Sequence, residues 1–260
     1  GNAVQLLGRM IHGISHGTPG FLADFQGGNM HNAIPREAWA TIACPVGQSE
    51  PLLNSIEKQF EIVRAEFEGV EPGMELSIEK VPTPDEVWPT YTAWDVLNLI
   101  VALPHGVMGM SQDIEGLVET STNLAVAKSE GGIFRILMSS RSSVASSLDW
   151  IRQKIRAIAS QAEARVDEHG GYPGWKPDLD SPVLKVVKSV HARVLGSEPH
   201  VEAVHAGLEC GIIGEMIPGM DMISFGPQIE FPHSPNERVK VDSVGRFYDL
   251  LAAVLEELAK

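Results

Sequence analysis

Reactive side chains on stiff backbone are rare in this sequence, and His233 is the clearest case. It lies in the tetrapeptide Pro232-His233-Ser234-Pro235, where the prolines hold the segment extended. The loop follows residues 220–225, an apolar run that predicts a buried strand, and open α/β sheets bind ligands at the carboxyl ends of their strands. His233 is therefore a candidate metal ligand or acid/base, although an ordinary exposed loop histidine remains the simpler interpretation of this pattern alone.

Two further polar residues are candidate ligand-binding groups. Asn32 lies in a predicted turn after Gly27-Gly28, where its carboxamide either donates hydrogen bonds to a carbonyl oxygen or satisfies its own backbone as an Asx turn. Arg141 ends an apolar strand, and its guanidinium either captures a carboxylate with two hydrogen bonds or forms a surface salt bridge. Both interpretations of each residue stay open on these patterns.

The turn Gly207-Leu208-Glu209 leads into a predicted helix. Gly207 has no side chain to prevent a backbone amide from approaching a ligand. Glu209 either contacts an amine or stabilises the N-terminus of the helix that it begins. The remaining histidines carry no such pattern.

Several segments together resemble one enzyme family. The C-terminal run HAGLECG, MDMISFGP, PHSPNE and DSVGRFYDLL resembles the aminoacyl-histidine (Xaa-His) dipeptidases, carnosinase-like members of the dinuclear-zinc aminopeptidase and carboxypeptidase superfamily. The segments FQGGNMHNAIPREAWATI, ETSTNLAVAK, ILMSSRSS and GGYPGWKPDLDSPV resemble the lid domain and return strand of the same enzymes. The resemblance therefore covers nearly the whole chain, in the expected order.

This resemblance implies a reaction and a role for each candidate. The reaction is hydrolysis of Xaa-His dipeptides, in which two zinc ions share the attacking hydroxide and a glutamate acts as general base. By resemblance, His233 is a zinc ligand, Asn32 polarises the scissile carbonyl, and Arg141 binds the carboxylate of the substrate. Gly207 and Glu209 belong to the substrate-binding turn.

The sequence also departs from the family pattern. The remaining metal ligands of the family precede the lid, and nothing in residues 1–260 matches them. Because one imidazole cannot hold a dinuclear site, we expect this chain to be inactive alone and the complete protein to be a dipeptidase. The chain begins in an amphipathic pattern without an initiator methionine, which predicts an interior segment. The alternatives are a non-catalytic dimerisation or binding module, and an aminoacylase or carboxypeptidase of the same superfamily.

Composition limits the partners. Lys and Arg total 20 against 34 Asp and Glu, and the net charge of −14 disfavours nucleic acid and anionic membranes. No apolar run approaches the roughly 20 residues that span a bilayer. The two cysteines are far apart and predict neither a disulfide nor a zinc site. We expect a cytoplasmic enzyme that forms a homodimer through its lid.

The predicted fold class is α/β, with a boundary in the Gly- and Pro-rich stretch that begins at residue 170. Residues 1–170 predict a lid with antiparallel sheets and packed helices, and 171–260 predict a C-terminal βαβ segment of a catalytic α/β domain. Predicted helices cover 2–16, 49–67, 92–103, 146–160, 182–195, 210–213 and 244–258. Predicted strands cover 21–25, 38–44, 74–81, 119–127, 133–139, 162–167, 200–204 and 220–225, with 105–116 as loop.

Overall fold

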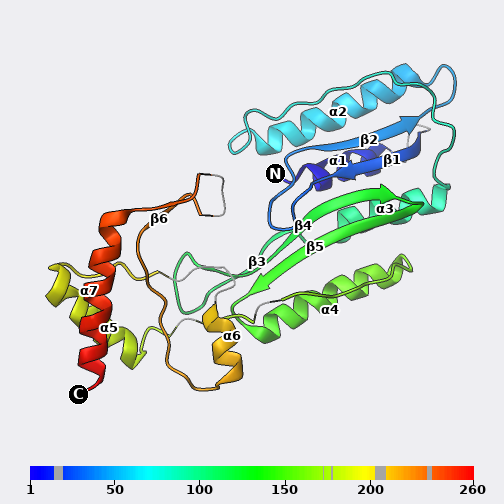
Figure 1. The fold of residues 1–260 in the computed structure, drawn as a ribbon. Coiled ribbons are helices and arrows are strands. Elements are labelled where there is room, and N and C mark those ends of the chain that lie inside the picture. Colours follow the sequence, from blue (N-terminus) through cyan, green and yellow to red (C-terminus); the bar gives the residue numbers. More distant parts are fainter. Residues whose placement is uncertain (15–19, 172, 177, 203–208, 233–235) are drawn as a thin grey trace. The chain divides into compact units, whose positions relative to one another are not determined.

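The computed structural model divides the chain into two compact units, shown in Figure 1. Unit 1 comprises Gly1–Ser142 and Ser146–His169, and unit 2 comprises Ser143–Ala145 and Gly170–Lys260. The structure describes residues 1–14, 20–171, 173–176, 178–202, 209–232 and 236–260.

Unit 1 is built on an antiparallel sheet in which β4 is the shared strand. β4 pairs with β5 along almost its whole length and also pairs with β1 and β3, while β2 pairs with β1. The strands are β1 (Phe21–Gly27), β2 (Ala38–Ala43), β3 (Gly106–Met110), β4 (Val118–Glu130) and β5 (Ile133–Ser142). A bulge between Leu124 and Val126 shifts the register of β4 against β5.

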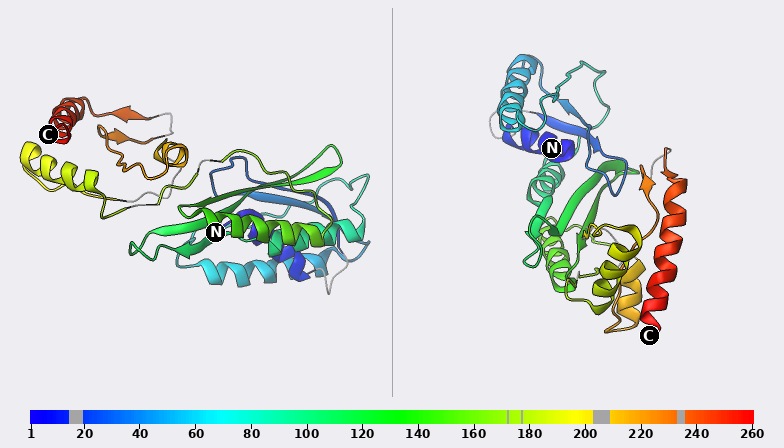
Figure 2. Two further views of the ribbon diagram at one scale, coloured as in Figure 1. Left: turned by 90° about the horizontal axis from the view of Figure 1, so that it is seen from below. Right: turned by 90° about the vertical axis from the view of Figure 1, so that its left-hand side faces the viewer.

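The helices of unit 1 gather on one side of this sheet, as the left view of Figure 2 shows. Apolar residues recur on one side of each helix and alternate along each strand. The apolar side of the helices and the apolar face of the sheet therefore pack together into one core. The helices are α1 (Ala3–Ile14), α2 (Ser49–Phe67), α3 (Thr90–Ala102) and α4 (Ala145–Gln161). The buried members of the core are Val4, Ile11, Leu22, Phe25, Val96, Leu97, Ile100, Leu103, Leu124 and Ala127.

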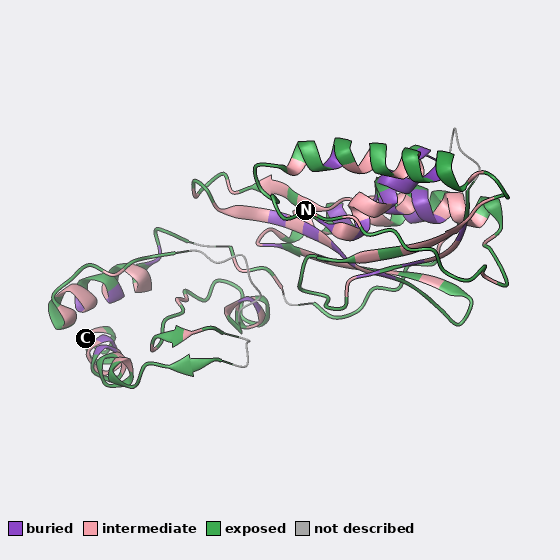
Figure 3. Ribbon diagram, turned by 90° about the horizontal axis from the view of Figure 1, so that it is seen from above, coloured by how far each residue is buried: buried purple, intermediate pink, exposed green. Residues whose placement is uncertain are grey.

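The alternation along β5 defines the opposite face of the sheet. Phe134, Ile136 and Met138 pack against the core, whereas Leu137 and Arg141 are exposed. The burial colours in Figure 3 follow the same alternation along the strands. Within the described residues no helix of unit 1 covers this second face, which we call the open face of the sheet.

Asn2 connects α1 to the sheet. Its side chain is 3% exposed, accepts a hydrogen bond from the Gln5 amide at 3.2 Å, and donates one to the Leu124 carbonyl at 2.8 Å. It is thus the predicted N-cap of α1. The amide of Asn2 also lies 3.3 Å from Nδ1 of His105, and burial lowers the pKa of that imidazole. His105 is half-buried and lies in the loop between α3 and β3.

Unit 2 contains a helix pair and smaller elements: α5 (Pro182–Leu195), α6 (Glu209–Met216), β6 (Ile229–Glu230), β7 (Arg238–Val239) and α7 (Val241–Leu258). Ser181 is the N-cap of α5, where its hydroxyl accepts from the Leu184 amide at 3.0 Å. The same hydroxyl donates to Asp221 at 2.5 Å, and the Val183 amide donates to Asp221 at 2.8 Å. These two hydrogen bonds hold the pKa of Asp221 below its usual range.

The predicted α/β fold class is confirmed, but four local predictions differ from the structure. Residues 74–81 and 220–225 form no strand and pair with none of the described strands. Residues 162–167 form no strand either: this segment leaves α4, and the following Glu168 is held by Arg152 and Arg156 of that helix. Residues 106–110, predicted as loop, pair with β4 as β3.

The predicted βαβ unit is likewise not formed within the described residues. Residues 200–202 are not in a strand, and residues 203–208, which include the turn that follows, lie outside the described residues. The helix of that unit is present as α6, and the only strand pairing described in unit 2 is between β6 and β7. Nothing in the described part of the chain is a helix long and apolar enough to cross a membrane.

Candidate functional site

Asn32 lies in the connection between β1 and β2, in a turn at residues 31–32. Its side chain is exposed, and its carboxamide has no hydrogen-bond partner among the described residues. The structure therefore does not show the Asx turn that the sequence left open. Both amide hydrogens are available to a ligand.

Three contacts fix this connection to the rest of unit 1. Gly28 has φ +74°, and a Cβ there would lie 2.0 Å from the Ala125 carbonyl oxygen, so only glycine allows the chain to approach β4 this closely. The Ala3 amide donates to the Pro35 carbonyl at 3.0 Å. Nδ2 of Asn123, on β4, donates to the Ala33 carbonyl at 2.7 Å. The residue next to Asn32 is thus bonded directly to the central strand.

Arg141 lies on β5 opposite Ser121 of β4, with its side chain exposed. Its guanidinium forms no ion pair with any residue that the structure describes, so the surface salt bridge considered for it is absent there. The neighbouring Ser140 and Ser142 pair through their hydroxyls with Thr122 and Thr120, each at 2.8 Å. These cross-strand bonds fix the strand on both sides of Arg141 and direct its side chain to the open face.

β4 therefore positions both candidates. Ser121, opposite Arg141, and Asn123, bonded to Ala33, are two residues apart on one strand and point to the same face. Two residues of strand span about 6.7 Å. The Asn32 turn and the guanidinium of Arg141, which has no ion-pair partner among the described residues, consequently belong to one face of one sheet.

The remaining predicted site residues belong to unit 2. Glu209 is the first residue of α6, with an exposed side chain that contacts no partner within the described residues, and its charge suits the N-terminus of a helix. Gly207 and His233 lie outside the described residues. Among those that are described, no three His, Cys, Asp or Glu side chains are close enough to hold a metal ion.

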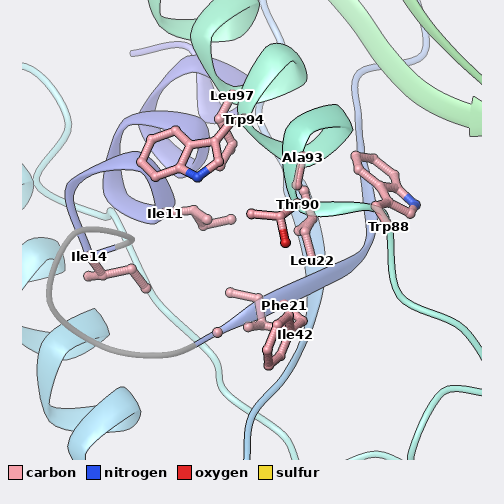
Figure 4. A pocket seen from close by; sticks show the side chains of 11 residues that line it. Ile11, Ile14, Phe21, Leu22, Ile42, Trp88, Thr90, Ala93, Trp94 and Leu97 are labelled. Atoms are coloured by element: carbon pink, nitrogen blue, oxygen red, sulfur yellow. The ribbon is translucent and has the colours of Figure 1, made fainter.

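A cavity of about 210 Å³ in unit 1 has none of these candidates in its lining, which Figure 4 shows. It lies between α1, α3 and the first two strands, and none of its described lining residues has a titratable side chain, so these residues offer no acid, base or metal ligand. Its lining is Ile11, Ile14, Gly20, Phe21, Leu22, Ile42, Trp88, Thr90, Ala93, Trp94 and Leu97.

Asn123 lies near the candidates, and no motif in the sequence marks it. A signal was present, because asparagine is depleted in strands and this one lies in the middle of an otherwise β-prone run. The alternation with Ser121 also places it on the face of Arg141. Only the structure shows that its side chain reaches the Asn32 turn.

Comparison with known proteins identifies the class. Residues 8–257 match the family described as Peptidase family M20/M25/M40, and this chain belongs to that family of metallopeptidases. It is 35% identical to the cytosol non-specific dipeptidase of Escherichia coli K12 over 258 residues, which are 99% of this chain and 53% of the relative. An uncharacterised Bacillus subtilis protein, YqjE, is 24% identical over 160 residues, which are 56% of this chain and 42% of that protein.

A solved structure is similar throughout. The crystal structure of aminoacylhistidine dipeptidase from Vibrio alginolyticus matches with a TM-score of 0.90 and 37% identity, over 99% of this chain and 52% of that protein. The resemblance drawn from the sequence motifs is therefore confirmed. The chain spans about half the length of the two dipeptidases that it matches over nearly its whole length.

Proposed function

We propose that this chain is part of a metal-dependent dipeptidase that hydrolyses Xaa-His dipeptides at a dinuclear zinc centre. Asn32, Arg141, Gly207 and Glu209 contact the substrate, and His233 is one metal ligand. Support comes from the 35% and 37% identity to two dipeptidases over 99% of the chain. The observation that carries the proposal is the open face of unit 1, where the amide of the Asn32 turn and the guanidinium of Arg141 have no partner among the described residues.

These two groups match two polar groups of a dipeptide, its C-terminal carboxylate and the carbonyl of its peptide bond. The guanidinium of Arg141 binds the C-terminal carboxylate through two parallel hydrogen bonds. The carboxamide of Asn32 donates to the scissile carbonyl oxygen, on which negative charge develops during attack. Arg141 therefore contributes mainly to substrate binding, whereas Asn32 contributes mainly to stabilisation of the transition state.

The residues described in this chain do not themselves form a zinc site. Bound zinc supplies the attacking hydroxide in such enzymes. On this proposal His233 provides one ligand, the other ligands come from a part of the protein outside this chain, and the chain alone is inactive. We also place the homodimer contact on unit 1 and the protein in the cytoplasm.

The test compares this chain with a longer protein that contains it and the missing ligands. Both are assayed on Xaa-His dipeptides, on dipeptides without histidine, on N-acetyl amino acids and on longer peptides, and zinc is measured by elemental analysis. We expect activity on Xaa-His dipeptides and about two zinc ions per chain in the longer protein only. Stoichiometric zinc in the 260-residue chain would show that the assignment of ligands is wrong.

The substitutions Arg141→Ala and Asn32→Ala test the two roles separately. Arg141→Ala should raise KM on the order of 10²-fold for a dipeptide with a free carboxylate and have little effect on the C-terminal amide of the same dipeptide. Asn32→Ala should lower kcat by on the order of 10²-fold. Preference for acetylated amino acids would instead indicate an aminoacylase, and a longer protein that dimerises without hydrolysing any substrate would indicate a non-catalytic module.

A further inference from the structure

Asn123 occupies an unusual environment for a residue in the middle of a strand. Its Nδ2 donates to the Ala33 carbonyl across 90 residues of sequence, at 2.7 Å. Its Oδ1 is shielded from solvent and has no hydrogen-bond partner among the residues that the structure describes. A shielded acceptor without a partner costs free energy, and Thr or Val would suit the strand better. Such a residue at this position calls for a function that outweighs its local cost.

We propose that Asn123 is a positioning residue, which sets the place of the Asn32 turn relative to Arg141 and so matches the two groups to one dipeptide. This inference rests on the proposed function, because it assumes that Asn32 and Arg141 bind the same substrate. Asn123 acts through the Ala33 carbonyl and does not contact the substrate itself.

The register of the sheet supports this role. Asn123 lies opposite Ser139, and Ser121 lies opposite Arg141. Asn123, which holds the turn, and Arg141 are therefore separated by two residues along the same pair of strands. The hydroxyl pairs Thr120–Ser142 and Thr122–Ser140 fix that pair of strands from the core side. The Asn123 amide then transmits this fixed geometry to the turn. A shift of about 1 Å in a substrate-positioning group can reduce the rate 10²-fold.

The chemistry of the contact restricts the residue type. The acceptor is a backbone carbonyl, so the side chain at position 123 must donate. Asp has the same shape but only accepts when ionised, whereas Ala removes the contact altogether. Asn123→Asp and Asn123→Ala therefore break the same hydrogen bond, and the first keeps the packing around it.

The experiment measures kcat and KM of both variants in the longer dipeptidase proposed above. We expect kcat to fall by about tenfold to 10²-fold while KM changes by no more than about twofold, because Arg141 keeps its place. In the Asn32→Ala background, Asn123→Ala should lower kcat by no more than about a further twofold, since the group that it positions is already absent. The matched control is Asn98→Ala, which removes a single side-chain hydrogen bond, to His12, on the helical side of the sheet.

Hydrogen exchange supplies a readout that is independent of activity. In the 260-residue chain, both variants at position 123 should speed the exchange of amides 30–34 and leave those of β4 and β5 unchanged. An equal loss of kcat in the presence and absence of Asn32 would overturn the positioning role, and so would normal kinetics with a loosened turn. Absence of dipeptidase activity in the unsubstituted longer protein would instead overturn the proposed function, while the exchange result would still report on the turn.

Discussion

The two units differ in how completely they bury their apolar residues. Among the described residues, unit 1 has a core of ten buried side chains from helices and strands, whereas the core of unit 2 has four, all from α5 and α7. In unit 2, α7 buries Leu250 and Val254, but Tyr248 is 71% exposed and Leu255 is 58% exposed. An amphipathic helix normally hides its large apolar residues, so α7 carries more apolar surface than α5 covers.

This difference indicates that the two units are stabilised differently. Unit 1 pairs its strands and covers one face of its sheet with its own helices, and its stability follows from contacts within itself. Unit 2 has a short strand pair, and Asp221 contributes polar bonds at the start of α5. On the proposed function, the exposed side of α7 packs against a part of the catalytic domain outside this chain.

The largest expected effect comes from core truncation in each unit. Phe25→Ala removes a fully buried ring that also packs edge-to-face on Phe134, and it should destabilise unit 1 by about 3–5 kcal/mol. Leu250→Ala should cost unit 2 about 2 kcal/mol, since a smaller core collapses more easily. Urea unfolding should resolve two transitions, and tryptophan fluorescence should report mainly unit 1, which holds four of the five tryptophans. A single coincident transition for all probes would contradict the comparison.

The exposed side of α7 gives the second prediction. In this chain Leu255→Ser should change the free energy of unfolding by less than about 0.5 kcal/mol, because the side chain is largely in solvent. In the longer protein the same substitution should cost about 2 kcal/mol or more, since the leucine is then buried. Denaturant titrations of the two proteins measure both values. Equal small effects would show that this side of α7 stays exposed.

A third prediction concerns pH and unit 1 alone. Burial lowers the pKa of folded His105 below 6.5, so the unfolded chain takes up a proton first as the pH falls. The contribution of His105 is therefore complete above pH 6.5 and is lost progressively below it. The fluorescence-detected stability should fall between pH 7.5 and 5.5, and less so in His105→Gln. The exposed His169→Gln serves as the control, and an unchanged profile in His105→Gln would contradict the assignment.

The smallest effect is expected at the end of unit 1. Arg156 hydrogen-bonds Glu168 at 2.5 Å, with Arg152 as a second donor, and these bonds lower the pKa of Glu168 to about 2. The stabilisation is present above the usual glutamate pKa of 4.5 and is lost as the pH falls toward about 2. Because the ion pairs are partly exposed, Glu168→Gln at pH 7 should cost less than about 1 kcal/mol. The cost should shrink further in 0.5 M salt; a larger or salt-insensitive cost would require another contact.

The sequence predicted most helices and the paired strands of unit 1, because amphipathic periodicity and glycine turns are local signals. It failed at 74–81, 162–167 and 220–225, where a strand-like pattern lacks a partner strand, and pairing depends on distant residues. It failed in the opposite sense at β3, whose glycine- and methionine-rich sequence resembles a loop but pairs with β4. The roles of Asn32, Arg141, Gly207, Glu209 and His233 came from the family resemblance and remain proposals.

The sequence by itself determined the family, the fold class and the chemical type of each candidate group, because these depend on residue identity and order. Only the tertiary structure placed the Asn32 turn and Arg141 on one face of the sheet. That placement depends on a hydrogen bond from Asn123 and on the register of β4 against β5, which join residues about 90 and about 20 positions apart, respectively. Long-range contacts of this kind leave no periodic pattern in the sequence, since periodicity reflects the local structure of each segment and not which distant segment it contacts.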